Sequence, residues 1–404
     1  MLSVEQARQR ILEHLQPLGG ETVSLAQGLG RVLAEDVIAR LTQPPVAVSA
    51  MDGYAVRAAD VTAVPVTLTV IGEAPAGGAF AGQVGRGQAV QIFTGGPLPQ
   101  GADAVVIQED TDRQGDAVTI KEAALAKQNI RDAGIDFRAG QTLLTRGRLL
   151  SARDIALAAA ANHAWLTVGR RPRIAILATG DELVRPGETI GPNQIVSSNG
   201  PGLAAFVRAC GGEAVDLGIA PDDPQRLREI ASRATGVDML ITIGGASVGD
   251  HDLVQKELSQ IGLTVDFWKI AMKPGKPLMF GAFNGIPMIG LPGNPVSALV
   301  CAILYLRPAI LALQGSSDTA IPMARAKLTQ SLKANNFRED FLRATLSQGG
   351  HGEALVTPLP VQDSSMLFAL ARADCLIRRP PDAPPSDAGE WVPIVPLGGG
   401  LLGI

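Results

Sequence analysis

The sequence predicts a multidomain protein that joins one α/β domain to two β-rich domains. Apolar strands alternate with helices between residues 172 and 317, which is typical of a parallel sheet covered on both faces. Residues 46–140 hold short β-branched runs separated by glycine and proline, and residues 318–404 return to that texture. Such runs read as strands. We therefore predict an inserted β-rich domain in the first stretch and a small β-barrel-like domain in the second.

A discontinuous helical part completes the predicted domain organisation. Helices are expected at residues 3–16, with Ser3 as N-cap, and at 24–35. Residues 141–171 resume the helical character of the N-terminal region, with a helix at 151–162, so the β-rich stretch is an insertion. The predicted domains are an N-terminal helical and linker domain at 1–45 with 141–171, an inserted β-rich domain at 46–140, an α/β domain at 172–317 and a C-terminal β domain at 318–404.

Hydrophobic patterning gives the individual elements. In the β-rich insertion we expect strands at 64–71, 89–93, 104–108 and 117–121. In the α/β domain we expect strands at 173–178, 213–220, 239–243, 264–268, 277–280 and 288–289, and helices at 200–210, 223–234 and 295–313. In the C-terminal domain we expect strands at 324–332, 340–346, 354–359, 365–369 and 391–395, and an exposed proline-rich loop at 378–385.

Composition excludes several classes of protein. The net charge of −4 and the aromatic share of 4% argue against a nucleic-acid-binding protein. Three dispersed cysteines and four dispersed histidines give neither a disulfide framework nor a zinc site, which fits a reducing cytoplasm. The N-terminus lacks an apolar h-region and the longest apolar run has about eleven residues, so we expect no signal peptide and no membrane span.

Three loops at predicted strand ends carry glycine, acidic or polar residues. They are Thr179-Gly180-Asp181-Glu182-Leu183, Gly244 to Gly249, and Leu291 to Ala298. Ligands of such sheets bind at the carboxyl ends of the strands, where backbone N–H groups can form an anion-binding nest. The glycine spacing matches neither the P-loop nor the dinucleotide fingerprint, so ATPase and nicotinamide functions lose support.

A basic loop follows in the same domain. Lys269, Lys273 and Lys276 fall within eight residues, and the loop up to Pro277 also holds two prolines and one glycine. A stiff backbone can hold ammonium groups around a phosphate or another oxyanion with little ordering cost. A solvated surface loop is the alternative for a charge cluster of this kind.

One short stretch identifies a family. Ser49-Ala50-Met51-Asp52-Gly53-Tyr54-Ala55, after two prolines, resembles the signature of the molybdopterin molybdenumtransferase family, which includes the gephyrin E domain. The three strand-end loops resemble the molybdopterin-binding domain of that family. The resemblance extends from residue 27 to about Trp391, and it departs at Ala47, where many members carry an acidic residue.

The resemblance implies a reaction. The family inserts molybdate into adenylylated molybdopterin and releases AMP and molybdenum cofactor, with Mg²⁺ as cofactor. It also implies a cytoplasmic homodimer whose pocket lies between the α/β domain of one subunit and other domains of its mate, so that Asp52 and Lys273 would act together across the dimer. A molybdopterin adenylyltransferase and a receiving molybdoenzyme are possible partners; we expect neither nucleic acid nor membrane.

The resemblance also assigns site residues by position. The catalytic candidates are Asp52, Asp136, Glu182, Asp222, Asp252, Lys269 and Lys273, of which Asp52, Glu182 and Asp252 are metal-ligand candidates. The substrate-binding candidates are Thr94, Gly244, Gly245, Ser247, Gly249, Pro292, Pro295, Arg343 and Ser364.

Two alternatives remain open at this point. The first is a molybdopterin adenylyltransferase acting one step earlier, which explains residues 172–315 but leaves both β-rich domains unused. The second is a non-catalytic, gephyrin-like scaffold.

Overall fold

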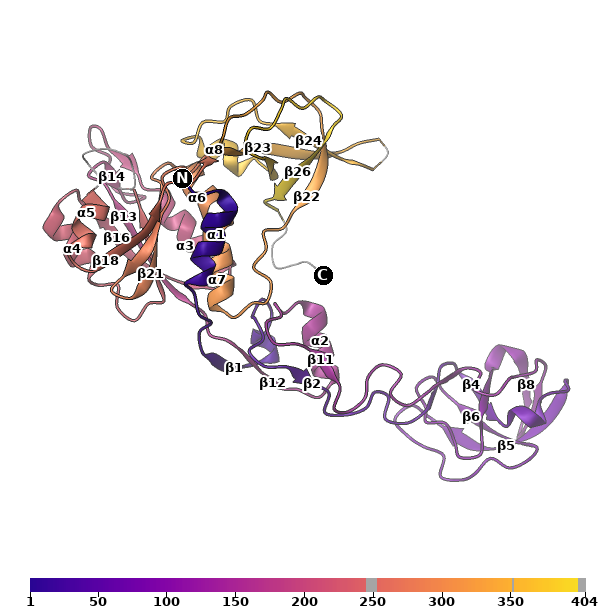
Figure 1. Ribbon diagram of the computed structural model, residues 1–404. Helices are drawn as coiled ribbons and strands as arrows, with labels where there is room; N and C mark the ends of the chain where they lie inside the picture. The colour runs from indigo at the N-terminus through magenta and orange to yellow at the C-terminus, as the bar shows by residue number, and fades with distance from the viewer. Residues whose placement is uncertain (245–252, 351, 399–404) are drawn as a thin grey trace. The chain divides into compact units, whose positions relative to one another are not determined.

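The computed structural model describes residues 1–244, 253–350 and 352–398. The chain forms two compact units, which we describe in turn (Figure 1). The first unit comprises Met1–Glu35, Arg146–Arg153 and Trp165–Ile404, and the second comprises Asp36–Thr145 and Asp154–Ala164.

The second unit is built on a six-stranded sheet, in agreement with the β-rich domain that the sequence predicts. Its strand order is β7-β4-β6-β5-β9-β8. The strands are β4 (Gly53–Val56), β5 (Val66–Ala74), β6 (Gln88–Ile92), β7 (Ala104–Ile107), β8 (Thr111–Gln114) and β9 (Ala117–Ile120). Glycine is required at the start of β4, because a Cβ on Gly53 would lie 2.0 Å from the Val106 carbonyl oxygen.

Short pairings complete this unit. They join β2 (Val37–Ile38) to β11 (Thr142–Leu144), and β3 (Val48–Ser49) to β10 (Ile130–Arg131). The helix α2 (Ala152–Ala160) lies within the helix expected at 151–162.

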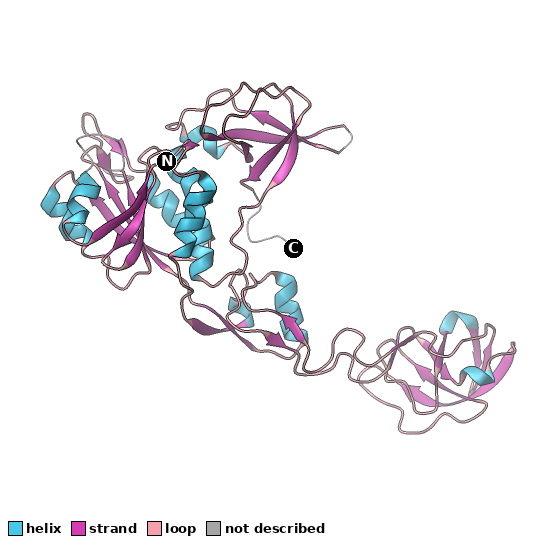
Figure 2. Ribbon diagram, in the orientation of Figure 1, coloured by secondary structure: helices cyan, strands magenta, loops and turns pink. Residues whose placement is uncertain are grey.

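The α/β part of the first unit is a six-stranded sheet of order β16-β13-β17-β21-β20-β18. Figure 2 distinguishes its strands from the helices packed on it. The strands are β13 (Arg173–Thr179), β16 (Glu213–Ala220), β17 (Met239–Ile243), β18 (Leu263–Trp268), β20 (Met279–Phe283) and β21 (Ile286–Leu291). The first four in spatial order are parallel, but β20 is antiparallel to both of its neighbours. The expectation of an all-parallel sheet is therefore wrong at this edge. Asn284 and Gly285, both at positive φ, form the two-residue hairpin turn that reverses the chain.

Helices cover both faces of this sheet. Alternate residues of β13 point to opposite faces, since successive strand side chains alternate. Ile174 and Ile176 enter one core with α1 (Val4–Glu13), α3 (Asn199–Ala209), α6 (Pro295–Cys301) and α7 (Arg307–Leu313). Ala175 and Leu177 enter the other with α4 (Pro224–Ala231) and α5 (Leu253–Ser259). The helix α1 begins at the expected N-cap, where Ser3 and Gln6 form a capping box, and it lies beside α7 (Figure 1).

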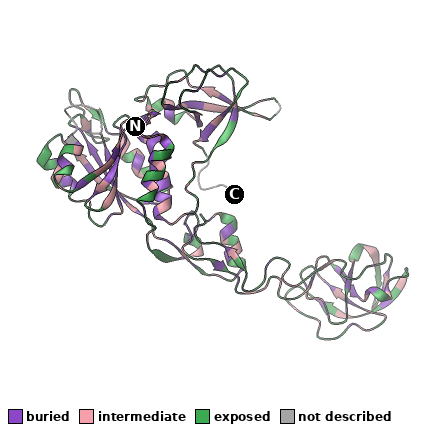
Figure 3. Ribbon diagram, in the orientation of Figure 1, coloured by how far each residue is buried: buried purple, intermediate pink, exposed green. Residues whose placement is uncertain are grey.

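The segments α6 and α7 belong to one continuous helix with a π-helical turn at Ala302–Leu306. In the described part of the chain, Pro295–Leu313 is the one helix long and apolar enough to cross a membrane, but 78% of its most apolar window is buried inside the protein (Figure 3). It serves as a core helix.

The C-terminal part of the first unit is a closed barrel of five strands, as the sequence predicts. Pairings run β23-β24-β22-β26-β25 and return to β23. The strands are β22 (Ala324–Leu328), β23 (Glu339–Gln348), β24 (Ala354–Pro358), β25 (Cys375–Arg379) and β26 (Trp391–Pro396). A short strand from the α/β part, β19 (Met272–Lys273), pairs in parallel with β23.

Three local expectations are wrong. Residues 24–35 do not form a helix: β1 (Gly20–Ser24) pairs with β12 (Trp165–Gly169), a 3₁₀ turn follows, and Gly30 adopts φ 71°. Residues 365–369 are not a strand, because α8 (Leu367–Ala371) occupies this place. The proline-rich loop is only partly exposed, because Arg379 ends β25 and its guanidinium donates to Ser386 and to the Pro384 carbonyl.

Candidate functional site

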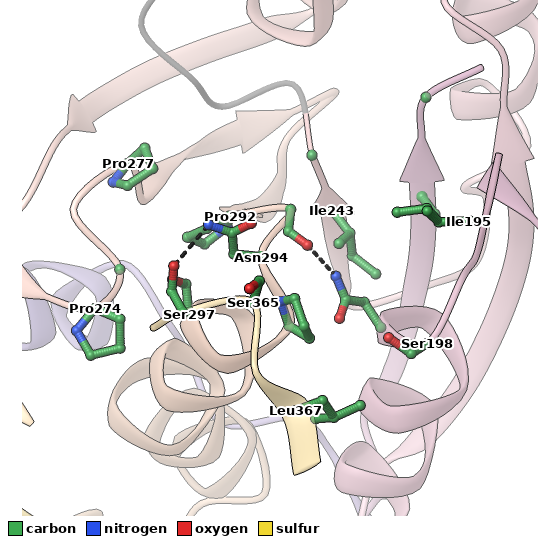
Figure 4. Close-up of a pocket in the computed structure, with 18 of the residues that line it drawn as sticks. Ile195, Ser198, Ile243, Pro274, Pro277, Pro292, Asn294, Ser297, Ser365 and Leu367 are labelled. Atoms are coloured by element: carbon green, nitrogen blue, oxygen red, sulfur yellow. Dashed lines mark hydrogen bonds between the residues drawn. The ribbon is translucent and has the colours of Figure 1, made fainter. Parts of the chain in front are cut away.

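A cavity of about 1130 Å³ opens in the first unit at the carboxyl ends of β13, β17 and β21 (Figure 4). The loop after β13 contributes Glu182, the end of β17 contributes Gly244, and the loop after β21 contributes Pro292 and Pro295. All four are residues that the family resemblance assigns to the site. The geometry agrees with the rule that α/β sheets bind ligands at these strand ends.

The acidic side of the cavity is formed by Glu182 and Asp222. Glu182 lies against the backbone of Gly180, since a Cβ there would be 2.3 Å from Glu182 Oε2. Asp222 follows β16, and its backbone N–H donates to Asp181 Oδ1 over 3.0 Å, which ties the two acidic loops together. Both carboxylates line the cavity.

The basic side is the loop from Met272 to Pro277, which carries Lys273 and Lys276 into the lining. The Tyr305 hydroxyl donates to Met272 Sδ over 3.4 Å, and the Cys301 thiol contacts the Gly275 carbonyl oxygen at 3.8 Å. Gly275 has φ 106°, and a Cβ there would lie 2.5 Å from Cys301 Sγ. The core helix therefore holds this loop at two points.

Lys269 lies apart from the other two lysines of the motif. It is not among the lining residues, and its ammonium lies 4.1 Å from the centroid of the Trp268 ring. Its backbone N–H donates to the Leu278 carbonyl. A cation over an aromatic face is held by the ring quadrupole, so Lys269 packs on the tryptophan in this structure.

The barrel supplies the third side. Asn294 Nδ2 donates to the Ser364 hydroxyl over 2.8 Å, and Asn199 Nδ2 donates to the Gly293 carbonyl over 2.6 Å (Figure 4). The candidate Ser364 thus lines the cavity and is joined to the loop after β21. Beside it, the Ser365 hydroxyl and N–H lower the pKa of Asp363 by donating to its carboxylate.

Arg343 is behind this side and does not line the cavity. It is completely buried, and its backbone N–H and carbonyl both bond to the side chain of Gln362, which does line the cavity. Arg343 Nε has no hydrogen-bond partner among the described residues. Burial lowers the pKa of this guanidinium.

The remaining described candidates, Asp52, Thr94 and Asp136, belong to the second unit. The backbone N–H of Thr94 donates to Asp52 Oδ1 over 2.6 Å, and its hydroxyl donates to the same oxygen over 2.7 Å. These bonds lower the pKa of Asp52, the backbone bond more than the hydroxyl bond. Asp136 is exposed, and its backbone N–H donates to the Gln43 carbonyl.

Four candidates, Gly245, Ser247, Gly249 and Asp252, lie outside the described residues. Within the described ranges, no three His, Cys, Asp or Glu side chains gather closely enough to hold a metal ion. The carboxylates of Glu182 and Asp222 are hard oxygen donors at a roomy cavity, and Mg²⁺ takes one or two such ligands together with substrate phosphates. The donor set therefore fits Mg²⁺ only with a phosphate-bearing substrate.

Comparison with known proteins extends over the whole chain. It is 36% identical over 402 residues to the molybdopterin molybdenumtransferase of Haemophilus influenzae, covering 98% of this chain and 99% of the relative. It is 37% identical over 404 residues to molybdopterin molybdenumtransferase 2 of Mycobacterium tuberculosis, with the same coverage. The chain belongs to the molybdopterin molybdenumtransferase family.

Family models and solved structures agree with this membership. Residues 2–162 match the MoeA N-terminal region (domain I and II), 175–312 match a probable molybdopterin binding domain, and 325–397 match the MoeA C-terminal region (domain IV). The structure of the molybdopterin biosynthesis MoeA protein from Pyrococcus horikoshii aligns with TM-score 0.82 at 32% identity, covering 99% of this chain and all of that chain.

Sequence reasoning missed several lining residues of this molybdopterin molybdenumtransferase family member. Asn199, Asn294, Ser297, Arg338 and Asp363 all line the cavity. Asn294 and Ser297 lie inside the loop motif that the sequence does single out. The other three come from α3 and from the barrel side, and only the tertiary fold brings them to the sheet.

Proposed function

We propose that the protein inserts molybdate into adenylylated molybdopterin, yielding molybdenum cofactor and AMP. The observation that carries this proposal is the cavity at the strand ends. It combines ammonium groups on a braced loop with two carboxylates, in a chain similar over its full length to molybdenumtransferases. Molybdate and both phosphate groups of the substrate are anions, which match the basic side.

The charges suggest a division of roles. Lys273, Lys276 and the strand-end backbone hold the oxyanions, because charge-assisted hydrogen bonds are the strong ones. Pro292 and Pro295 fix the loop against which the pterin lies, and Ser364 offers a hydroxyl to the bound anion. Binding the substrate across these loops orients its dithiolene sulfurs toward molybdate, which removes much of the entropic part of the barrier.

The chemistry that Mg²⁺ would supply, if bound, is positive charge against the charge that develops as the anhydride breaks. Among the residues that line the cavity, Glu182 and Asp222 would hold the ion. Asp52 and Asp252 remain metal-ligand candidates from the family resemblance. We keep the other assignments that the family resemblance implies. These are catalytic roles for Asp136, Asp252 and Lys269, and a substrate-binding role for Arg343. Asp52 with Thr94 supplies an ionised carboxylate from the second unit.

We further propose a cytoplasmic homodimer. The catalytic candidates divide between the two compact units, with Asp52 in one and Lys273 in the other. A second subunit gives such a chain a way to complete its site. A molybdopterin adenylyltransferase would supply the substrate and an apo-molybdoenzyme would take the product.

The test is release of AMP. Purified protein is incubated with adenylylated molybdopterin, Mg²⁺ and molybdate, with a parallel reaction lacking molybdate. We expect AMP to form faster with molybdate. No AMP under either condition would favour the scaffold, and formation of adenylylated molybdopterin from ATP and molybdopterin would favour the adenylyltransferase.

A further inference from the structure

The carboxylate of Asp340 lies next to the basic side of the cavity and has no role in the reaction proposed above. Asp340 is on β23, and it is the register partner of Lys273 on β19 in a parallel pairing. Lys273 lines the cavity, whereas Asp340 is not among the lining residues. Asp340 therefore neighbours the basic side of the cavity through this pairing without lining the cavity itself.

One oxygen of this carboxylate has no partner. Asp340 Oδ1 exposes less than 1 Å² and forms no hydrogen bond with any described residue. A buried acceptor without a donor costs folding free energy, so its presence here calls for an explanation. Burial raises the pKa of Asp340, and the cations Lys273, Arg338 and Arg379 oppose that rise in this order.

These three cations are not equivalent. The Arg379 side chain already has hydrogen-bond partners inside the protein, because it is buried and donates to Ser386 and to the Pro384 carbonyl. Lys273 and Arg338 both line the cavity, and Arg338 also donates from Nε to Asn336 Oδ1 over 3.4 Å. The negative charge of Asp340 therefore acts on Lys273 and Arg338, the two cations that an oxyanion in the cavity would contact.

We propose that Asp340 is the built-in counter-anion of this cavity, which lowers the affinity of Lys273 and Arg338 for an oxyanion so that the anion can exchange. A carboxylate near ammonium and guanidinium groups reduces the positive potential that they produce in the cavity. The identity of the anion as molybdate rests on the proposed function. The effect of the charge does not, since any small dianion would meet the same potential.

Asp340→Asn tests this inference, because it removes the charge and keeps the shape. We expect molybdate alone, titrated calorimetrically without pterin, to bind about three- to fivefold more tightly, as expected for a partly screened charge. The difference should vanish near 1 M ionic strength, where the Debye length is about 3 Å. In a Lys273→Ala background, Asp340→Asn should still tighten binding, but by a smaller factor, because only Arg338 remains of the two lining cations.

Asp112→Asn is the matched control, since Asp112 is exposed on β8 of the second unit. It should leave molybdate affinity unchanged. Asp340→Ala makes the same comparison if the asparagine variant does not fold, as judged by circular dichroism.

Unchanged or weaker molybdate binding by folded Asp340→Asn would overturn the inference. So would a tightening of equal size with and without Lys273, or wild-type protein that takes up no molybdate at millimolar concentration. Failure of the proposed function would look different, as absence of AMP release from protein that still binds the anion.

Discussion

Thr94 gives both of its donors to one carboxylate oxygen of Asp52, the backbone N–H at 2.6 Å and the hydroxyl at 2.7 Å. The two residues are 42 positions apart, and the loop after β6 meets the segment before β4 because these strands are antiparallel neighbours. The contact fixes the direction of an exposed carboxylate. It also favours the ionised form, since both bonds are made to the charge.

Thr94→Val should raise the pKa of Asp52 toward the ordinary value of 3.8. The rise should be partial, because the larger contribution, from the backbone N–H, remains. A lowered folded-state pKa adds stability above the unfolded pKa and loses it as the pH falls through the folded value. The variant should therefore lose less stability on acidification, within the acid range below about pH 4.

A carboxyl NMR titration of Asp52 checks this directly. Thr67→Val is the control, because Thr67 bonds to Thr119 elsewhere in the same unit. An Asp52 pKa that does not move in Thr94→Val would show that the hydroxyl bond is unimportant in solution.

Asp52→Asn should leave the fold intact and suppress turnover strongly. The substitution keeps the shape of an exposed side chain and removes its charge. AMP release and circular dichroism are measured on the same preparation. Near-normal AMP release with an unchanged spectrum would exclude a catalytic role for Asp52.

Gly53→Ala should destabilise the sheet of the second unit by more than about 2 kcal/mol, because its Cβ would collide with the Val106 carbonyl and force the strands apart. Gly19→Ala is the control, since no atom lies within 4 Å of a Cβ there. Hydrogen exchange of the β4, β6 and β7 amides reports the stability of this unit alone. Equal protection in both variants would contradict the packing described here.

The protein should be a homodimer in solution. Light scattering at micromolar concentration gives its mass against the 41.9 kDa of one chain. A monomer in a preparation that releases AMP would show that one chain completes the site.

Local signals predicted much of the fold. The capping box at Ser3 places α1, and the apolar runs give β16 and β17 with their observed bounds. The antiparallel edge of the sheet was missed, although Asn284-Gly285 is a strong hairpin signal. The helix expected at 24–35 failed because pairing with β12 and two glycines outweigh helical periodicity.

The site was only partly predictable, for a physical reason. Motifs name residues that are close in sequence, such as Glu182 or Lys273. Arg338 and Asp340 reach the basic loop only because β19 pairs with the barrel strand β23, a contact that connects segments about 67 residues apart (340 − 273). Nothing in the local sequence specifies such a pairing.

Titration of molybdate at saturating adenylylated molybdopterin, with AMP release as the readout, tests most directly whether this cavity handles molybdate. Wild type, Lys273→Ala and Lys256→Ala are compared; Lys256 is exposed on α5 and is the matched control. A lost charge-assisted hydrogen bond costs about 1.5–3 kcal/mol, so Lys273→Ala should need roughly ten- to 150-fold more molybdate for half-saturation. Lys256→Ala should match wild type. Superimposable curves for all three proteins would contradict the assignment of molybdate to this cavity.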